Sequence, residues 1–103
     1  MSKFKMNKRV VCSDGFAMSV QARAASYCSP RRDDAERYES VEIGYPNRLE
    51  TLLLHYAEDP ENPEGTVYGW VPVSLVTLVI AKHGGMIAGE VPPGVAPLLG
   101  SDL

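Results

Sequence analysis

An Asp14-Gly15 pair between two short apolar runs is the feature that most constrains this sequence. The flanking segments within residues 8–22 are rich in Val, Phe and Met, and an Asp-Gly pair between such runs is the strongest short-range signal of a β-hairpin. Alternate residues from Phe16 to Val20 are apolar, which predicts one buried face and one face toward solvent. The sequence therefore predicts a hairpin at the start of the fold.

Two further segments have strand patterns. Val41, Ile43 and Tyr45 alternate with small or polar residues, which predicts a third strand with one buried face. Residues 66–71, TVYGWV, are rich in β-branched and aromatic residues and predict a fourth strand. Residues 23–37 lack periodicity and contain a Ser-Pro pair, which predicts a loop with room for one short helical turn.

One amphipathic helix is expected over residues 73–83. Pro72 suits the first turn of a helix, and Gly84-Gly85 provides a stop signal. The apolar stripe of this helix consists of Leu75, Val76, Val79 and Ile80.

The remaining segments are less regular. Residues 49–57, LETLLLHYA, suit either a buried strand or a two-turn helix, and we favour the helix. Residues 58–65 combine acidic residues with Pro and Gly, which predicts an exposed acidic loop. After Met86 the chain is rich in Gly and Pro, which predicts no regular structure and a flexible or loosely docked tail.

These elements predict an α+β fold, with a small antiparallel sheet (the hairpin plus two further strands) covered by one amphipathic C-terminal helix. A chain of 103 residues has room for one hydrophobic core. We therefore expect a flexible basic N-terminus over residues 1–7, a single domain over residues 8–85, and a Pro/Gly-rich tail over residues 86–103.

The composition and charge bound the cellular setting. No apolar run approaches the ~18 residues that a membrane span needs, and we expect no signal peptide, because only three apolar residues separate the basic start from a polar turn. With two cysteines and no secretory signal, we expect free thiols, a cytoplasmic location and no membrane partner. Residues 1–32 carry a formal charge of +6 and residues 33–64 carry −8, an asymmetry that favours either a charged partner or internal neutralisation.

The sequence contains no recognisable catalytic or metal-binding set, and we expect no enzyme activity and no cofactor. His55 and His83 lack metal-ligand spacing, and we interpret them as a core-edge residue and a helix-end residue. Cys12 lies in a predicted strand and is expected to be buried, whereas Cys28 lies in a polar loop beside arginines, where a reactive thiol is an alternative to an inert one. Phosphate-binding Gly-rich loops are absent.

Three groups of residues are candidates for binding. Tyr27, Ser29, Arg31 and Arg32 could hold a nucleotide, because arginine pairs with phosphate and tyrosine stacks on bases; the alternative is that the arginines pair locally with Asp33, Asp34 and Glu36. The second group is acidic and consists of Glu39, Glu42, Glu58, Asp59, Glu61 and Glu64. These carboxylates could bind a basic groove on a partner, or they could simply be exposed to solvent. The third group is aromatic and consists of Tyr45, Tyr56, Tyr68 and Trp70. We interpret these residues mainly as core or core-edge residues, and we expect Tyr68 and Trp70 to share one side of a strand.

The strings DGFAMSVQA, YCSPR, VEIGYP, AEDPENPEGTVYGWVPVSLV and HGG resemble a family of short accessory proteins encoded by phages and prophages. The resemblance covers roughly residues 10–85. It implies a viral protein in the host cytoplasm that blocks host defence or redirects host machinery by binding, a class that includes anti-CRISPR proteins and proteins that sequester nucleotide signals.

Two functional hypotheses from different classes follow. The first is a non-enzymatic binder that inhibits a host protein or nucleoprotein complex through its acidic or aromatic residues. The alternative is a protein that sequesters a nucleotide signal, in the form of a homo-oligomer with sites at subunit boundaries. A virion component and an enzyme are further alternatives.

Overall fold

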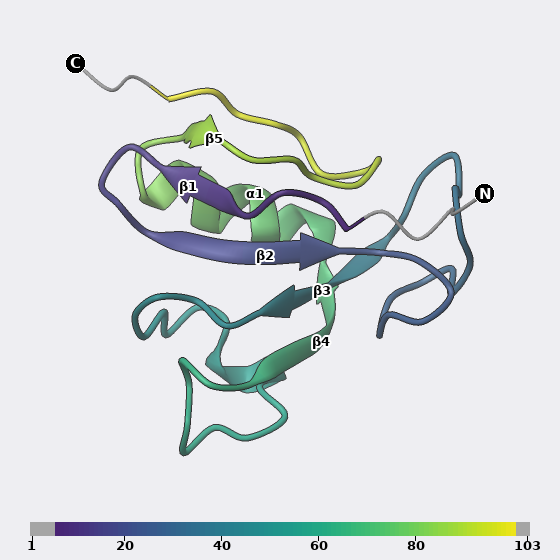
Figure 1. Cartoon of the computed structure of the whole chain (residues 1–103), viewed down its shortest axis with the longest axis horizontal. Coiled ribbons are helices and arrows are strands. Elements are labelled where there is room, and N and C mark those ends of the chain that lie inside the picture. The colour runs from purple at the N-terminus through teal and green to yellow at the C-terminus, as the bar shows by residue number, and fades with distance from the viewer. Residues whose placement is uncertain (1–5, 101–103) are drawn as a thin grey trace.

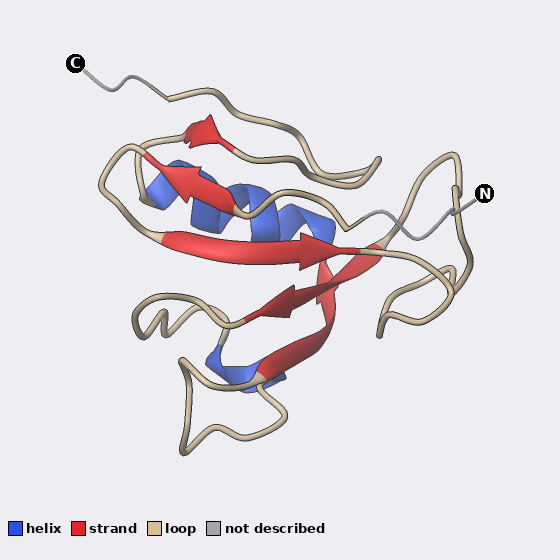
Figure 2. Cartoon of the chain, in the orientation of Figure 1, coloured by secondary structure: helices blue, strands red, loops and turns tan. Residues whose placement is uncertain are grey.

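The computed structural model describes residues 6–100, and within that range it contains a five-stranded sheet, one α-helix and one 3₁₀ helix (Figures 1 and 2). The elements are β1 (Val10–Cys12), β2 (Ala17–Gln21), β3 (Ser40–Gly44), η1 (Leu54–Tyr56), β4 (Val67–Pro72), α1 (Val73–Lys82) and β5 (Met86–Ala88). Neighbouring strands are antiparallel in the order β4-β3-β2-β1-β5. The predicted α+β class, with one helix packed on an antiparallel sheet, is confirmed. Most of the expected N-terminal segment, residues 1–5, lies outside the described residues.

The predicted hairpin is confirmed as β1 and β2. Gly15 has a φ of +92°, and its N–H donates to the carbonyl of Cys12, which closes the turn. The Asp14 carboxylate accepts the N–H of Phe16 at 2.9 Å, and the Asn47 side chain binds the backbone of Ala17 and Gly15. Local turn chemistry and one distant asparagine together hold this end of the sheet.

The core lies between the sheet and α1, which Figure 1 shows behind β1 and β2. Val76, Val79 and Ile80 of α1 are buried, as the predicted stripe requires. They pack with inward-facing strand residues, including Val10, Met18, Val20, Val41, Ile43, Tyr68 and Val71. Within residues 6–100 no helix has the length and apolar character needed to cross a bilayer.

The two-turn helix expected over residues 49–57 is wrong, because this segment forms turns and the short η1 instead. Leu53 is fully buried, whereas Leu49 and Leu52 are exposed, so the apolar residues do not share one helical face. The Glu50 side chain is also buried and its carboxylate accepts the N–H of Leu52, which replaces helical hydrogen bonding with a local turn.

The prediction that no regular structure follows Met86 is also wrong. Residues 86–88 form β5, which pairs with β1 and becomes an edge of the sheet. Further along, Val95 is buried and the carbonyl of Pro93 accepts the N–H of Tyr38 at 2.9 Å. Residues 86–100 are therefore packed on the domain, because strand pairing and burial of single apolar residues compensate for the many Gly and Pro.

Both edges of the sheet are covered by short stretches of chain. On the outer side of β4, Ala57 forms a bridge with Tyr68 and Glu58 donates its N–H to Val67. On the outer side of β5, residues 98–100 exchange hydrogen bonds with Met86. Covered edges limit the addition of a strand from another molecule.

Candidate binding surface

A β-bulge in β4 creates the most distinctive surface feature. Val41 pairs with Val71 and Ile43 pairs with Tyr68, so the single residue Glu42 lies opposite the two residues between those partners. These two residues are Gly69 and Trp70. A bulge of this kind re-aims the side chains of the strand that carries the extra residue.

The bulge turns Trp70 out of the fold. Its φ is +51°, a left-handed conformation that is uncommon for a residue with a large side chain, and 51% of the residue is exposed. Tyr68, two residues earlier, is fully buried. The expectation that Tyr68 and Trp70 share one side and belong to the core is therefore wrong, because the extra residue in the strand breaks the two-residue alternation.

Tyr27, from the loop between β2 and β3, holds the bulge in place. Its carbonyl accepts the Trp70 N–H at 2.9 Å, and the two rings stack with centroids 5.0 Å apart and planes inclined by 22°. A Cβ atom on Gly69 would lie 3.2 Å from the Tyr27 Cβ, so the glycine allows this close approach. The Tyr27 N–H is directed at the Glu42 carboxylate, 3.4 Å away.

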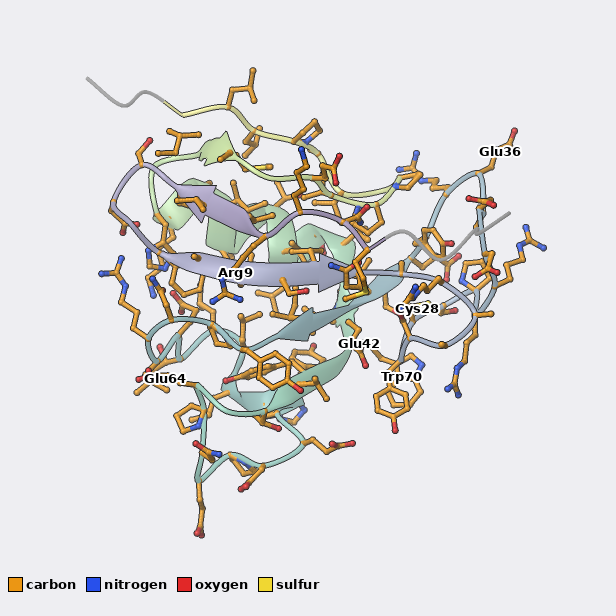
Figure 3. All side chains as sticks on the ribbon, in the orientation of Figure 1. Arg9, Cys28, Glu36, Glu42, Glu64 and Trp70 are labelled. Atoms are coloured by element: carbon orange, nitrogen blue, oxygen red, sulfur yellow. The ribbon has the colours of Figure 1, made fainter. Side chains whose placement is uncertain are left out.

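Arg31 adds a cation to the same group. Its guanidinium carbon lies 5.3 Å from the centroid of the Tyr27 ring, within cation–π distance, and its Nε–H donates to the Ala24 carbonyl. We call the four residues Tyr27, Arg31, Glu42 and Trp70 the aromatic surface; Figure 3 labels Glu42 and Trp70.

The loop that carries Tyr27 and Arg31 is fixed to the domain at several points. The Asp33 carboxylate accepts the Ala24 N–H, and Ser29 forms a backbone bridge with Ser40 at the start of β3. The Tyr38 hydroxyl, on a nearly buried side chain, donates to the Arg32 carbonyl at 2.6 Å. This bonding positions the aromatic surface although the loop has no regular secondary structure.

The structure separates the predicted nucleotide-binding residues. Tyr27 and Arg31 are in contact, whereas Ser29 is engaged through its backbone and the Arg32 side chain makes no contact with the Tyr27 ring. Among residues 6–100, neither Arg31 nor Arg32 forms an ion pair with the neighbouring acids named above as alternative partners. Sequence reasoning did not place Glu42 or Trp70 in this group.

The predicted acidic group is divided by the fold. Glu42 belongs to the aromatic surface, and Glu39 precedes the nearby start of β3. The other four acids lie in the exposed loop of residues 58–65, which leads into β4 at the far end of β3. Figure 3 accordingly shows Glu64 and Trp70 on opposite sides of the lower half of the molecule.

A second polar cluster surrounds His83 at the end of α1. Its Nδ1 lies 2.6 Å from an Asp14 oxygen and its Nε2 lies 2.6 Å from a Glu50 oxygen, while its ring stacks on Phe16 at 4.1 Å. Lys82 also binds the buried Glu50 carboxylate at 2.9 Å. With both ring nitrogens bonded to carboxylates, His83 has no nitrogen left for a substrate proton, so we assign this cluster a structural role.

The two carboxylates of this cluster are stabilised in their charged form. Burial raises the pKa of the Glu50 carboxyl, but hydrogen bonds from Lys82, the Leu52 N–H and His83 outweigh burial and hold the pKa below its ordinary value of 4.5. Burial likewise raises the pKa of Asp14, and the Phe16 N–H, His83 and the nearby Arg48 lower it below 3.8.

The other reactive residue types are not arranged for chemistry. Cys28 is only 1% exposed, so it is not a surface thiol, and burial raises the pKa of this thiol, which disfavours the reactive alternative. Burial and the charge of Asp14 raise the pKa of Cys12 to about 11. His55, expected at the core edge, is exposed and its ring contacts Tyr56. Within residues 6–100 no group of three His, Cys, Asp or Glu side chains is placed to hold a metal ion.

A half-open cavity of about 170 Å³ lies between the loop after β2 and the C-terminal segment. Its lining includes Gln21, Asp33, Tyr38 and Pro92, and excludes every residue of the aromatic surface. Sites for drug-sized ligands usually enclose about 300–1,000 Å³. The cavity is therefore small for a nucleotide.

No protein-family model, curated protein or solved structure matches this chain.

Proposed function

We propose that this chain is a non-enzymatic binding protein that inhibits a host protein complex, and that the aromatic surface is its contact face. The observation that carries the proposal is the exposure of Trp70 in a left-handed backbone conformation, stabilised by Tyr27. Strained residues in folded proteins cluster at functional sites, and a large exposed aromatic ring supplies contact area without a need to rearrange.

The residue types support protein recognition. Trp, Tyr and Arg are the types most enriched among residues that dominate the free energy of protein–protein association. Here all three lie in one stack, and the Tyr27 ring is already in contact with Trp70 and Arg31. The free aromatic area belongs to Trp70, which sequence reasoning did not include in the nucleotide site.

Tyr45 is the natural control for Trp70. It is 53% exposed and also left-handed, with a φ of +47°, but it lies just after β3, and its ring contacts no other aromatic or cationic residue among residues 6–100. If binding fell simply because an exposed aromatic side chain was removed, Tyr45→Ala and Trp70→Ala would therefore weaken it equally.

The test is quantitative affinity capture from bacterial host lysate on immobilised wild-type protein, Trp70→Ala and Tyr45→Ala. We expect a partner whose affinity falls about 30-fold with Trp70→Ala, equivalent to ~2 kcal/mol, and is unchanged with Tyr45→Ala. Equal retention by all three proteins would show that the aromatic surface is not the contact face.

The nucleotide alternative is tested in parallel by thermal shift with linear and cyclic nucleotides. We expect no rise in Tm, because the cavity of about 170 Å³ is small for a nucleotide and Arg31 is not part of its lining. A rise of several degrees that disappears when Arg31 and Arg32 are both replaced by Ala would replace the present proposal with nucleotide sequestration.

The acidic loop of residues 58–65 contributes at long range in this proposal, since it lies away from Trp70. Reversing the charges of Glu58, Asp59, Glu61 and Glu64 should slow association and weaken its salt dependence, with a smaller effect on dissociation. Surface plasmon resonance at two salt concentrations separates the two rates.

A further inference from the structure

We infer that the aromatic surface recognises a cationic side chain, Arg or Lys, presented by a basic segment of the partner protein. The inference rests on the proposed function and adds to it the chemistry of the bound group. Both Trp70 and Glu42 contact Tyr27: the Trp70 N–H donates to the Tyr27 carbonyl and its ring stacks on the Tyr27 ring, while the Glu42 carboxylate accepts the Tyr27 N–H.

The Trp70 ring is suited to a cation. Among aromatic side chains, Trp binds cations over its face most strongly, and half of this residue is open to solvent. The ring stacks on Tyr27 and has no cation of its own, because Arg31 lies over Tyr27 and not over Trp70. The fold therefore presents an aromatic face with its cation position vacant among the described residues.

Glu42 provides the complementary charge. It lies opposite Gly69 and Trp70 at the bulge, and within residues 6–100 it forms no ion pair. Its hydrogen bond with Tyr27 is long, at 3.4 Å, and uses one carboxylate oxygen. A carboxylate on the strand opposite an exposed Trp supplies the charge that distinguishes a guanidinium or ammonium group from a neutral one.

Other acidic residues near Glu42 also favour a positively charged ligand. Glu39 adds a second exposed carboxylate just before β3, and the acidic loop of residues 58–65 lies beyond the other end of that strand. An acidic environment of this kind attracts a basic segment of a partner before the two proteins touch. The same attraction operates when an acidic protein binds in the basic groove of a nucleic-acid-binding protein. Arg31 opposes this attraction at the Tyr27 end, and the loop between β2 and β3 that carries it also contains Arg23, Arg32 and Arg37.

The experiment uses the full chain and a dye-labelled peptide of alternating arginine and glycine. Two reference peptides are matched to it in length: one with citrulline, which keeps the shape without the charge, and one with glutamate. Binding is measured by fluorescence anisotropy, with the emission of Trp70, the single tryptophan, as a second readout in the proteins that retain it.

We expect saturable binding of the arginine peptide, at least 10-fold weaker binding of the citrulline peptide, and a change in Trp70 emission. Glu42→Gln and Trp70→Leu should each weaken binding of the arginine peptide by about 5- to 10-fold. Glu36→Gln is the matched control, because Glu36 is an exposed acid in the loop between β2 and β3 outside the aromatic surface, as Figure 3 shows, and should change nothing.

Three outcomes would overturn the inference. Equal binding of the arginine and citrulline peptides would show that no cation is recognised. Preferential binding of the glutamate peptide would mean that Arg31 makes the aromatic surface select a negatively charged side chain. Equal effects of Glu42→Gln and Glu36→Gln would show that only overall charge matters.

The failure of this inference is distinguishable from failure of the proposed function. If no peptide binds while lysate capture still depends on Trp70, the inference that a cationic side chain is recognised is wrong, and the proposed binding function stands. If neither measurement depends on Trp70, both are wrong.

Discussion

The N–H of Trp70 donates to the carbonyl of Tyr27 at 2.9 Å, and the rings of the same two residues stack 5.0 Å apart. This double contact joins β4 to the loop between β2 and β3, two segments that are far apart in sequence. Each therefore stabilises the other: the loop satisfies the backbone of the bulge, and the bulge gives the loop an aromatic anchor. The following predictions test this arrangement and the rest of the fold.

Replacing Trp70 by Gly should give a protein more stable than Trp70→Ala by about 1 kcal/mol, because glycine adopts the observed left-handed conformation without steric cost. The measurement is the free energy of unfolding in urea. Ser19, within β2 and outside the left-handed region, serves as the control: there Gly should be less stable than Ala. The same order at both positions would mean that Trp70 is not strained.

Replacing Glu50 by Gln should reduce the free energy of unfolding by about 3 kcal/mol, since it removes the buried partner of both His83 and Lys82. Glu58→Gln is the control, because its side chain is exposed, and it should cost less than about 0.5 kcal/mol. If urea denaturation finds a loss below 1 kcal/mol for Glu50→Gln, the cluster around His83 contributes little to stability.

The protein should lose stability as pH falls through the acid range. The pKa values of Asp14 and Glu50 are lowered in the folded state from 3.8 and 4.5, so folding favours their charged forms. Their contribution is therefore complete above about pH 5 and is lost as pH falls below these ordinary values. Tm measured from pH 7 to pH 2.5 should show this loss, and Glu50→Gln should make the decrease shallower. An equally steep decrease in the variant would contradict the assignment.

Both thiols should resist alkylation in the folded protein. Cys12 and Cys28 are buried, and burial raises the pKa of each, that of Cys12 to about 11. At pH 8 we expect labelling by iodoacetamide only after denaturation, as counted by intact mass spectrometry. Rapid labelling of native Cys28 would mean that the loop holding it opens readily.

The C-terminal segment should contribute to stability through its contact with Tyr38. Gly94 has a φ of +111°, and a Cβ atom there would occupy the space of the Tyr38 carbonyl oxygen. Gly15 also has a positive φ, of +92°, but a Cβ atom would meet nothing. We expect Gly94→Ala to cost at least 2 kcal/mol of unfolding free energy and Gly15→Ala about 1 kcal/mol. Equal costs would indicate that residues 90–95 pack loosely.

Short-range patterns predicted much of the fold correctly. The Asp14-Gly15 turn, the positions of β2 and β3, and the apolar stripe of α1 all depend on residues close in sequence, and the structure confirms each within about one residue. The alternation is only partly confirmed, because Tyr45 is exposed just after β3 and Gln21, on the face of β2 expected toward solvent, is buried. Such signals are reliable because turn geometry and the periodicity of a strand or helix depend on local backbone sterics. They also indicate the α+β class.

The aromatic surface was only partly predictable. Tyr27 and Arg31 were candidates from their residue types, and Gly69 within a strand pattern is a known sign of a bulge. The sequence does not show that Glu42 faces this bulge, since that register comes from pairing between β3 and β4.

The errors have the same origin. Residues 49–57 failed to form a helix because Glu50 is held by His83, and residues 86–100 are packed because β1 and Tyr38 offer hydrogen-bond partners. Periodicity and composition carry no information about partners that lie more than 30 residues away in the chain. The sequence thus specified most of the elements and the apolar face of α1, whereas long-range pairing and packing determined which side chains lie exposed together at the aromatic surface.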